Sequence, residues 1–234
     1  MRGKIIRGEL GPGEKINEVQ LASDLGISRS PLREALRVLE RERLIASIPR
    51  KGSLVTHVSL GDLEELHQMR EMIECYALDL LERKRVRELP QATSSIANPR
   101  NLVVPTESDS HETKIAYIET MAQFHLKLVE PSGNRRLFEF YQTIHSDINR
   151  YVFLNRFLQG AIAHRVEEHY QALEFIKKGQ FEKARQIIRS HIRFSCEQLK
   201  AKMKNQRRRN PFKYSITPPT KLVGNLSSRE KRDR

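Results

Sequence analysis

Residues 28–36 have the sequence SRSPLREAL, and this stretch has the composition of a helix start. Ser28 is a preferred N-cap residue, Pro31 suits the first turn, and a glutamate follows soon after. The apolar residues that follow recur every three or four positions and can dock the helix on a core; they are Leu32, Ala35, Leu36 and Leu39. Arg29 and Arg33 then project from the opposite side of the helix, near its N-terminus.

A second helix is predicted directly before this stretch. It begins near Asn17, covers residues 19–25 and ends at Gly26, and the helix that Ser28 starts continues to about residue 43. Helix, short turn and helix form the arrangement that places the N-terminus of the later helix in the major groove of DNA. Arginines at that end of a helix are placed to contact phosphates and base edges.

Two β-prone segments follow the helices. Residues 44–48 and 53–58 flank the tight, basic turn Pro49-Arg50-Lys51-Gly52. We therefore expect a two-stranded wing whose tip contacts phosphate or the minor groove. The first ten residues are expected to be the end of a further helix, which the sequence GPG at 11–13 closes.

The charge of the chain is unevenly distributed. Its 234 residues carry 42 Lys and Arg against 29 Asp and Glu, a net charge of +13. Residues 1–58 contribute +4 (11 against 7), residues 59–201 are neutral (20 against 20), and residues 202–234 contribute +9 (11 against 2). Contact with nucleic acid is therefore expected from the N-terminal segment and the tail, and not from the middle of the chain.

Composition also excludes some classes of protein. The mean hydropathy is −0.59, and no apolar run approaches the roughly 18 residues of a membrane-spanning helix. The start of the chain does not resemble a secretion signal, and the two cysteines, Cys75 and Cys196, do not have the spacing of a metal site. We expect a reduced, cytoplasmic protein without membrane contact.

From residue 59 onward the hydrophobic pattern is helical. Helices are predicted from residue 59 to about residue 89 and at about 112–130, 134–159, 161–178 and 181–203. Residues 90–111 have no period and are expected to form a loop, and the segment from Arg207 on is expected to be disordered. The predicted fold class is mainly α: a winged helix-turn-helix at 1–58, an antiparallel helical bundle at 59–203 and a basic tail at 204–234.

Three histidines lie on the apolar stripes of three different predicted helices. They are His125, His169 and His191, and each is spaced three or four residues from apolar neighbours, so each imidazole should point into the bundle. A single histidine in such a position is usually a hydrogen-bonded core residue. Three of them on facing helices also fit a shared metal site, because neutral imidazole is a common metal ligand. The other histidines lack this setting and are interpreted as surface or structural residues: His57, His67, His111, His145 and His164.

Arg70 occupies an apolar position in the helix that begins at residue 59. A guanidinium that faces a core is costly unless it is paired. Two interpretations stay open: Glu74, four residues on, satisfies the charge, or Arg70 anchors the carboxylate of a ligand.

The N-terminal motifs together resemble the winged helix-turn-helix of the GntR family of bacterial transcription regulators. The resemblance covers nearly all of residues 5–58 and rests on GELGPGE at 8–14, LASDLGISRSPLREALRVLERERLI at 21–45 and PRKGSLV at 49–55. It implies that operator DNA is contacted by the start of the later helix and by the wing tip, that is, by Ser28, Arg29, Ser30, Arg33, Arg50, Lys51 and Gly52. Arg43 stands where the family usually has glycine, and we expect strain in that turn.

The rest of the chain is similar to the all-helical FCD ligand domain of the same family. This resemblance rests on RxxxE at 70–74, FHxxLxxxSGN at 124–134, EHYQALEFIKKGQFEKA at 168–184 and SHI at 190–192. It implies that a divalent metal (zinc, nickel or manganese) binds to His125, His169 and His191, beside an organic-acid pocket that includes Arg70 and Asn134. Met121 stands where the family has a metal-binding aspartate, and a thioether is a poor ligand for such metals.

We therefore expect a non-enzymatic regulator that binds double-stranded operator DNA as a homodimer, with repression as the expected sign and a small carboxylate metabolite as its effector. Two rival functions stay open. One is a metal-dependent hydrolase on the three histidines, although Glu168 is expected to face away from the direction of His169 by about 100° and no general base is evident. The other is a sequence-independent DNA-binding protein whose affinity comes from the tail.

Overall fold

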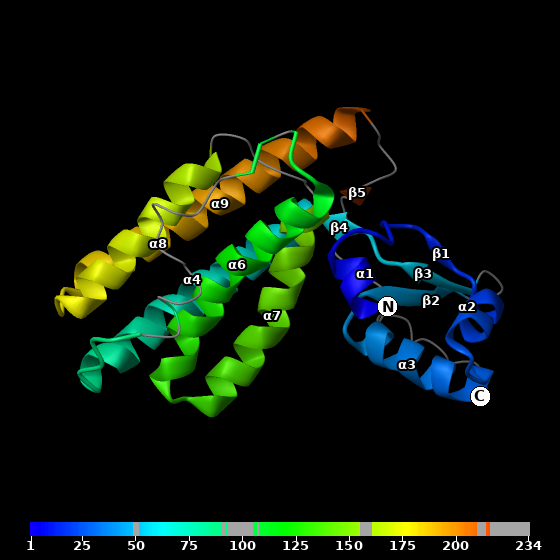
Figure 1. Cartoon of the computed structure of the whole chain (residues 1–234), viewed down its shortest axis with the longest axis horizontal. Coiled ribbons are helices and arrows are strands. Elements are labelled where there is room, and N and C mark those ends of the chain that lie inside the picture. Colours follow the sequence, from blue (N-terminus) through cyan, green and yellow to red (C-terminus); the bar gives the residue numbers. More distant parts are fainter. Residues whose placement is uncertain are drawn as a thin grey trace, which may run out of the picture. The chain divides into compact units, whose positions relative to one another are not determined.

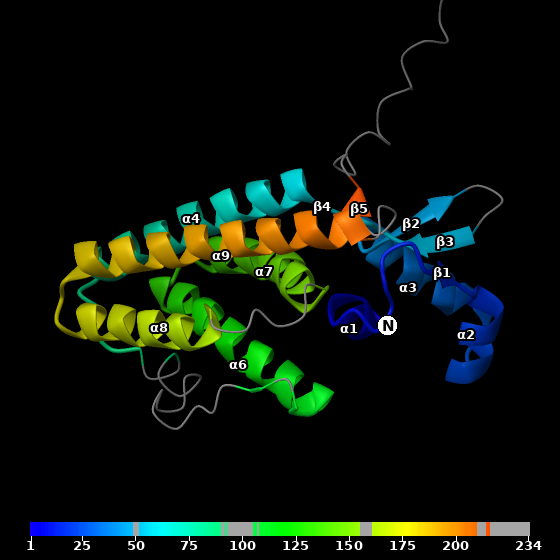
Figure 2. The same cartoon turned by 90° about the horizontal axis from the view of Figure 1, so that it is seen from above.

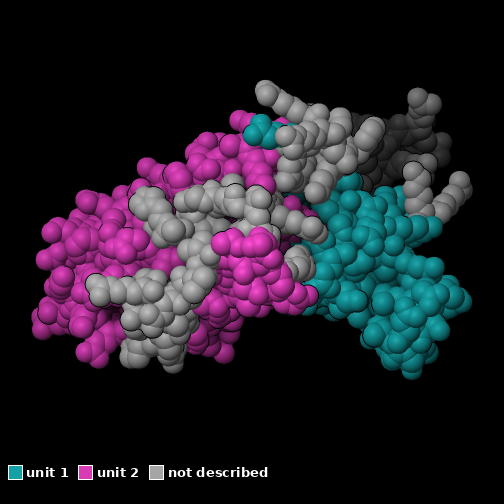
Figure 3. All heavy atoms as spheres, turned by 45° about the horizontal axis from the view of Figure 1, so that its top comes forward, with its two compact units in different colours: residues 1–62, 205–234 teal, residues 63–204 magenta. Residues whose placement is uncertain are grey.

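The computed structural model describes residues 1–48, 52–89, 92, 105–106, 108–154, 161–209 and 214–215. Contacts divide the chain into two compact units, which Figure 3 colours separately. One unit comprises Met1–Asp62 with Asn205–Arg234, and the other comprises Leu63–Lys204. The expected wing tip at Arg50 and Lys51 and most of the loop expected at 90–111 lie outside the described residues.

The N-terminal unit contains short helices and a small sheet (Figure 1). Its helices are α1 (Arg2–Ile6), α2 (Glu18–Leu25) and α3 (Arg29–Arg41), and its sheet consists of β1 (Lys15–Ile16), β2 (Ile45–Ile48) and β3 (Gly52–Val55). The strand order is β1-β3-β2, with antiparallel pairs throughout. The two-stranded wing is thus present, but β1 adds a third strand that the sequence did not predict, because two residues are too short for a visible alternation.

The helix boundaries follow the predicted caps. The Asn17 side chain accepts hydrogen bonds from the backbone N–H groups of Val19 and Gln20 (3.2 and 3.1 Å), and α2 ends at Gly26 with φ +62°. Ser28 occupies the N-cap position of α3, although its side chain makes no capping hydrogen bond. Arg43 has φ +57°, so the residue that replaces glycine in this turn adopts the left-handed conformation, as expected.

One face of α3 is buried in the core of the N-terminal unit. Leu32, Leu36 and Leu39 are at most 5% exposed and pack with Ile5, Ile45 and Val55, among others. Ala35, which we expected on this face, is exposed. It lies about 60° from Leu32 around the helix axis, at the margin of the stripe, where the core no longer covers the helix.

The strand expected at 53–58 ends at Val55, and Val58–Ser59 forms the separate strand β4. It pairs in parallel with β5 (Tyr214–Ser215). The expectation of disorder from Arg207 on is therefore wrong at residues 207–209, which are helical, and at β5. The remainder of the tail lies outside the described residues.

The second unit is a helical bundle. Its described helices are α4 (Leu60–Arg83), α6 (His111–Val129), the short 3-10 helix η1 (Glu130–Ser132), α7 (Arg135–Leu154), α8 (Ala161–Lys177) and α9 (Phe181–Arg209). The first residues of α4 and the last residues of α9 belong to the N-terminal unit. Helix α4 ends at Arg83, six residues before the predicted end at about residue 89. The predicted helix was too long because Val86 and Leu89 continue the apolar spacing and pack in the core without being helical. Helix α9 extends six residues beyond 203, since residues 204–209 contain no Gly or Pro and Pro211 follows them.

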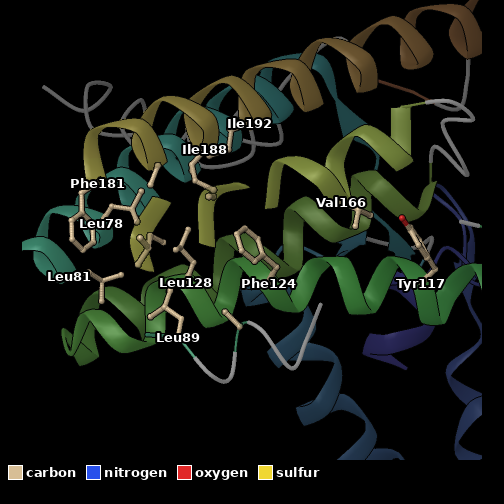
Figure 4. Close-up of a cluster of buried hydrophobic side chains, with 14 residues drawn as sticks. Leu78, Leu81, Leu89, Tyr117, Phe124, Leu128, Val166, Phe181, Ile188 and Ile192 are labelled. Atoms are coloured by element: carbon tan, nitrogen blue, oxygen red, sulfur yellow. The ribbon is translucent and has the colours of Figure 1, made fainter. Parts of the chain in front are cut away.

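Helices α4 and α9 lie side by side and run in opposite directions (Figure 2). Ion pairs join them along their length: Glu64–Lys200, Glu71–Arg193 and Asp79–Arg185. Inside the bundle, Figure 4 shows Phe124 and Leu128 rising from α6 toward α9, which contributes Ile188 and Ile192. Among the described helices, none combines the length and the apolar composition needed to cross a membrane.

Candidate functional site

The first candidate site is the N-terminal end of α3. Arg29, Ser30 and Arg33 are exposed there, and Ser28 is exposed at the cap. The Arg33 Nε atom lies 3.4 Å from a carboxylate oxygen of Glu18 on α2, but the Arg33 side chain is still 66% exposed. Such a long contact at the surface restrains the guanidinium weakly. The end of α3 thus presents two arginines that can reorganise around a polyanionic partner.

The second candidate site is the histidine cluster of the bundle. His125 on α6, His169 on α8 and His191 on α9 are each at most 5% exposed, and one nitrogen of each lies within 4.8 Å of the others. The Nε2 atoms of His169 and His191 are 3.2 Å apart. The predicted convergence of the three imidazoles is therefore present in the structure.

Two buried carboxylates lie behind these histidines. A Glu74 oxygen is 2.9 Å from His125 Nδ1, and a Glu168 oxygen is 2.8 Å from His191 Nδ1. The sequence argument that turned Glu168 away from the cluster is wrong, because Glu168 is only 8% exposed and contacts it through His191. Helix α8 buries a wide sector, so a step of about 100° from His169 does not leave the interior.

Arg70 is paired inside the same network. Its Nε atom donates to Glu74 Oε1 over 2.7 Å, and the Tyr141 hydroxyl donates to the same oxygen over 2.5 Å. Burial alone would lower the pKa of Arg70, but the charge of Glu74, together with Tyr141, outweighs burial and raises this pKa above its usual value. Burial and the Glu74 charge raise the pKa of Tyr141 well above its usual value, which keeps its hydroxyl protonated as the donor. Of the two interpretations left open for Arg70, pairing with Glu74 is the one that the structure displays.

The remaining predicted residues lie elsewhere. Asn134 is exposed at the start of α7, where its Oδ1 accepts a hydrogen bond from the backbone N–H of Leu137 (3.1 Å). Met121 is partly buried and packs against the apolar core. Gly52 begins β3 with φ +86°.

Two histidines outside the cluster are also buried. His67 Nδ1 is 2.9 Å from the Leu63 carbonyl oxygen, and His145 Nε2 is 2.9 Å from the Ala122 carbonyl oxygen. Burial, reinforced by the charge of Arg70, lowers the pKa of His145 to about 4. The side chains of His111 and His164 lie outside the described residues.

The three imidazoles fit a divalent metal. Two nitrogen ligands at the usual distance of about 2.0–2.1 Å from a tetrahedral metal are about 3.3 Å from each other, close to the 3.2 Å that separates His169 and His191. Ligating histidines commonly donate their second ring N–H to a carboxylate, and Glu74 and Glu168 provide that partner for His125 and His191. The donor set would be three imidazole nitrogens, which suit zinc and nickel better than manganese.

Comparison with known proteins places both units in one family. Residues 1–55 match the bacterial regulatory proteins of the GntR family, and residues 65–194 match the FCD domain. The HTH-type transcriptional regulator YdhC of Bacillus subtilis is 31% identical over 205 residues, which cover 86% of this chain and 88% of that protein. The gluconate operon transcriptional repressor of Bacillus licheniformis is 33% identical over 96 residues, 41% of this chain and 39% of that protein.

Solved structures agree with the fold. A GntR transcriptional regulator from Rhodococcus sp. RHA1 superposes with a TM-score of 0.70 at 20% identity, covering 85% of this chain and 92% of that one. McbR/YncC of Escherichia coli gives a TM-score of 0.69 at 18% identity, covering 86% and 94%. The chain therefore belongs to the GntR family, as a transcription regulator that joins a winged helix-turn-helix to a helical FCD domain.

Proposed function

We propose that the protein is a cytoplasmic, homodimeric repressor that binds paired operator half-sites and is controlled by a small carboxylate metabolite. We further propose that His125, His169 and His191 hold a divalent metal beside the effector. The observation that carries the proposal is the pairing of two unlike sites in one chain: exposed arginines at the start of α3, and a buried imidazole cluster in the bundle. Repression is the sign given in the names of several relatives.

The N-terminal unit supplies the DNA contact. Arg29 and Arg33 are assigned to base edges and phosphates in the major groove, together with Ser28 and Ser30, and Gly52 with the adjoining wing residues to the minor groove. A single recognition helix reads only a few base pairs, so specific binding at genomic scale calls for two copies on half-sites about one turn of DNA apart. This is the reason for proposing a dimer.

The bundle supplies the control. A divalent metal held by the three imidazoles would supply a positive charge to which a ligand carboxylate could bind, next to histidines that are themselves held by the buried carboxylates of Glu74 and Glu168. We assign the ligand carboxylate to this site and not to Arg70, whose charge is already matched by Glu74. Asn134 is assigned the role of capping α7.

Selection from a random DNA library, followed by binding titrations at fixed salt, tests the proposal. We expect a two-fold symmetric sequence that is bound at least a thousandfold more tightly than random DNA. The titration is repeated with chelator-treated protein, with added zinc, nickel or manganese, and with a panel of small carboxylates, at least one of which should weaken operator binding. Equal affinity for all DNA would contradict the proposal and favour non-specific binding through the tail.

A further inference from the structure

The two glutamates behind the histidines carry an inference beyond the metal site itself. His191 presents Nδ1 to Glu168 and Nε2 to His169, so its two nitrogens have different partners. His125 gives Nδ1 to Glu74. An imidazole that donates its Nδ1 proton to a carboxylate carries its lone pair on Nε2, and its ring orientation is fixed by the same bond.

We propose that Glu74 and Glu168 are positioning residues for the metal, and that Glu74 also couples metal binding to the DNA-binding unit. This inference rests on the proposed metal site. Glu168 lies on α8, next in sequence to His169, and acts within the cluster. Glu74 lies on α4, whose first residue, Leu60, directly follows strand β4 of the N-terminal unit.

Glu74 is built to transmit displacement of His125 to α4. Its side chain is 0% exposed, and three side chains from three helices bond its two oxygens. Arg70 and Tyr141 share Oε1, and His125 bonds Oε2. A carboxylate held on both oxygens cannot rotate to follow a moving imidazole without loss of a buried hydrogen bond, so a shift of His125 favours a shift of α4.

Thermodynamic linkage gives this coupling a measurable form. If metal binding changes operator affinity by some factor, operator binding changes metal affinity by the same factor. This factor is assigned to the bond between Glu74 and His125, because α4, which carries Glu74, is continuous with the N-terminal unit, whereas α8, which carries Glu168, lies wholly within the second unit. Glu74 and Glu168 therefore share the role of positioning a histidine, and Glu74 alone has the distinct role of coupling. The two positions can be tested against each other.

Metal affinity tests the shared role. Glu74→Gln and Glu168→Gln are compared with Glu167→Gln, which changes an exposed neighbour whose Oε1 accepts a local hydrogen bond from Gln171 (3.1 Å). Zinc affinity is measured on the full-length protein by competition with a chromophoric chelator. We expect a loss of about 10–100-fold for the first two variants and less than twofold for the third. Both of the first two should also shift the visible absorption bands of bound Co²⁺, which a merely structural role would not do.

Operator affinity with and without saturating zinc tests the distinct role. The zinc-dependent factor is the ratio of the operator affinities measured with and without zinc. Wild type and Glu168→Gln should show the same factor, whereas in Glu74→Gln zinc should no longer change operator affinity. Tyr141→Phe keeps the Glu74 charge and removes one of its restraints, so it should bind zinc within about threefold of wild type and show a smaller factor. This second variant keeps the test decisive if Glu74→Gln does not fold.

The outcomes separate this inference from the proposed function. If wild type binds no divalent metal, the proposed metal site fails and the inference fails with it. If wild type binds zinc but the Gln variants bind it equally well, only the positioning role is overturned. If Glu74→Gln and Tyr141→Phe both retain the full zinc-dependent factor, the coupling role is overturned while the metal site stands.

Discussion

Arg29 and Arg70 carry the same positive charge in opposite environments. Arg29 stands exposed at the first position of α3, where its charge remains hydrated. Arg70 is 5% exposed within α4 and donates to the buried carboxylate of Glu74. The first arginine costs the fold almost nothing, because water solvates it, whereas the second is tolerated only because its partner lies beside it.

The contrast matches the two roles in the proposed function, recognition by α3 and control by the bundle. A surface that must exchange water and counterions for DNA keeps its charges loosely held, as Arg33 does at 3.4 Å from Glu18. The proposed control site, in contrast, keeps its polar groups in fixed geometry, as the bonds of Glu74 to Arg70 and His125 show. The functional residues of the bundle should therefore be essential to stability, and those of α3 should not.

The largest expected effect is the loss of the buried arginine. Arg70→Met leaves the Glu74 carboxylate buried with only Tyr141 and His125 as partners, and we expect it to lower the free energy of unfolding by about 3–5 kcal/mol. Arg29→Met, the matched change at the surface, should stay within about 0.5 kcal/mol of wild type. Urea unfolding at pH 7 measures both variants.

The double variant Arg70→Met/Glu74→Leu is the control for unpaired charge. It removes both ions, so it should recover part of the stability that the single variant loses. If Arg70→Met were as stable as Arg29→Met, the buried Glu74 carboxylate would not need Arg70 as its partner. The contrast between the two arginines would then be wrong.

A second effect concerns pH. The pKa of His145 is about 4 in the folded protein, against a reference value of 6.5, because of burial and the Arg70 charge. The unfolded chain therefore binds more protons than the folded one between these values, so stability is full above about pH 6.5 and falls as the pH drops toward 4. The shift corresponds to about 3 kcal/mol.

The pH dependence of His145→Asn isolates this contribution. Urea unfolding at several pH values between 7 and 4 should give a shallower decline for the variant than for wild type, by about 3 kcal/mol over the range. An NMR titration showing that His145 protonates near pH 6.5 in the folded protein would contradict the prediction. In Arg70→Met, the pKa of His145 should rise, because one of the two causes of its depression is removed.

Sequence periodicity was enough to place the three histidines in the interior and to offer Glu74 as a partner for Arg70, but not to find the carboxylates that bond the histidines. The stripes of three- and four-residue spacing put His125, His169 and His191 in the interior, and the caps at Asn17 and Ser28 placed α2 and α3 to within a residue or two. Periodicity measures direction around one helix and is silent about its neighbours. The bond between Glu74 and His125 joins residues 51 positions apart, so it depends on how α4 and α6 pack.

Glu168 shows the same limit within one helix. The sequence argument gave a correct angle of about 100° from His169 but assumed that this angle leads to solvent. Helix α8 also buries Val166, Ala172 and Ile176, so its covered sector is wide enough to include Glu168. The strands β1 and β5 escaped prediction for a different reason, since two residues in a ladder leave no periodic signal.

A smaller effect is expected at the exposed N-terminal end of α3, and it should appear in DNA binding and not in the stability of the fold. Arg29→Ala and Arg33→Ala should each weaken operator binding by about 1–3 kcal/mol if these side chains contact bases. Arg41→Ala removes the same charge from the other end of α3, where it is also exposed, and should have the weaker effect of a distant phosphate contact or none. Binding titrations at one salt concentration compare the three. Equal losses would assign the effect to charge alone.

The smallest expected effect tests whether the backbone conformation of Arg43 destabilises the N-terminal unit. Arg43 has φ +57°, a conformation that side chains with a Cβ atom disfavour, and the Thr56 hydroxyl donates to its carbonyl oxygen over 2.7 Å. Arg43→Gly should raise the free energy of unfolding by up to about 1 kcal/mol, because glycine adopts this conformation without strain. Arg43→Ala removes the same exposed side chain and keeps the strain, so it should leave stability within about 0.5 kcal/mol of wild type. Urea unfolding of the two variants side by side measures both effects. If Arg43→Ala raised the free energy of unfolding as much as Arg43→Gly, the Arg43 side chain and not its backbone conformation would be the source of the destabilisation.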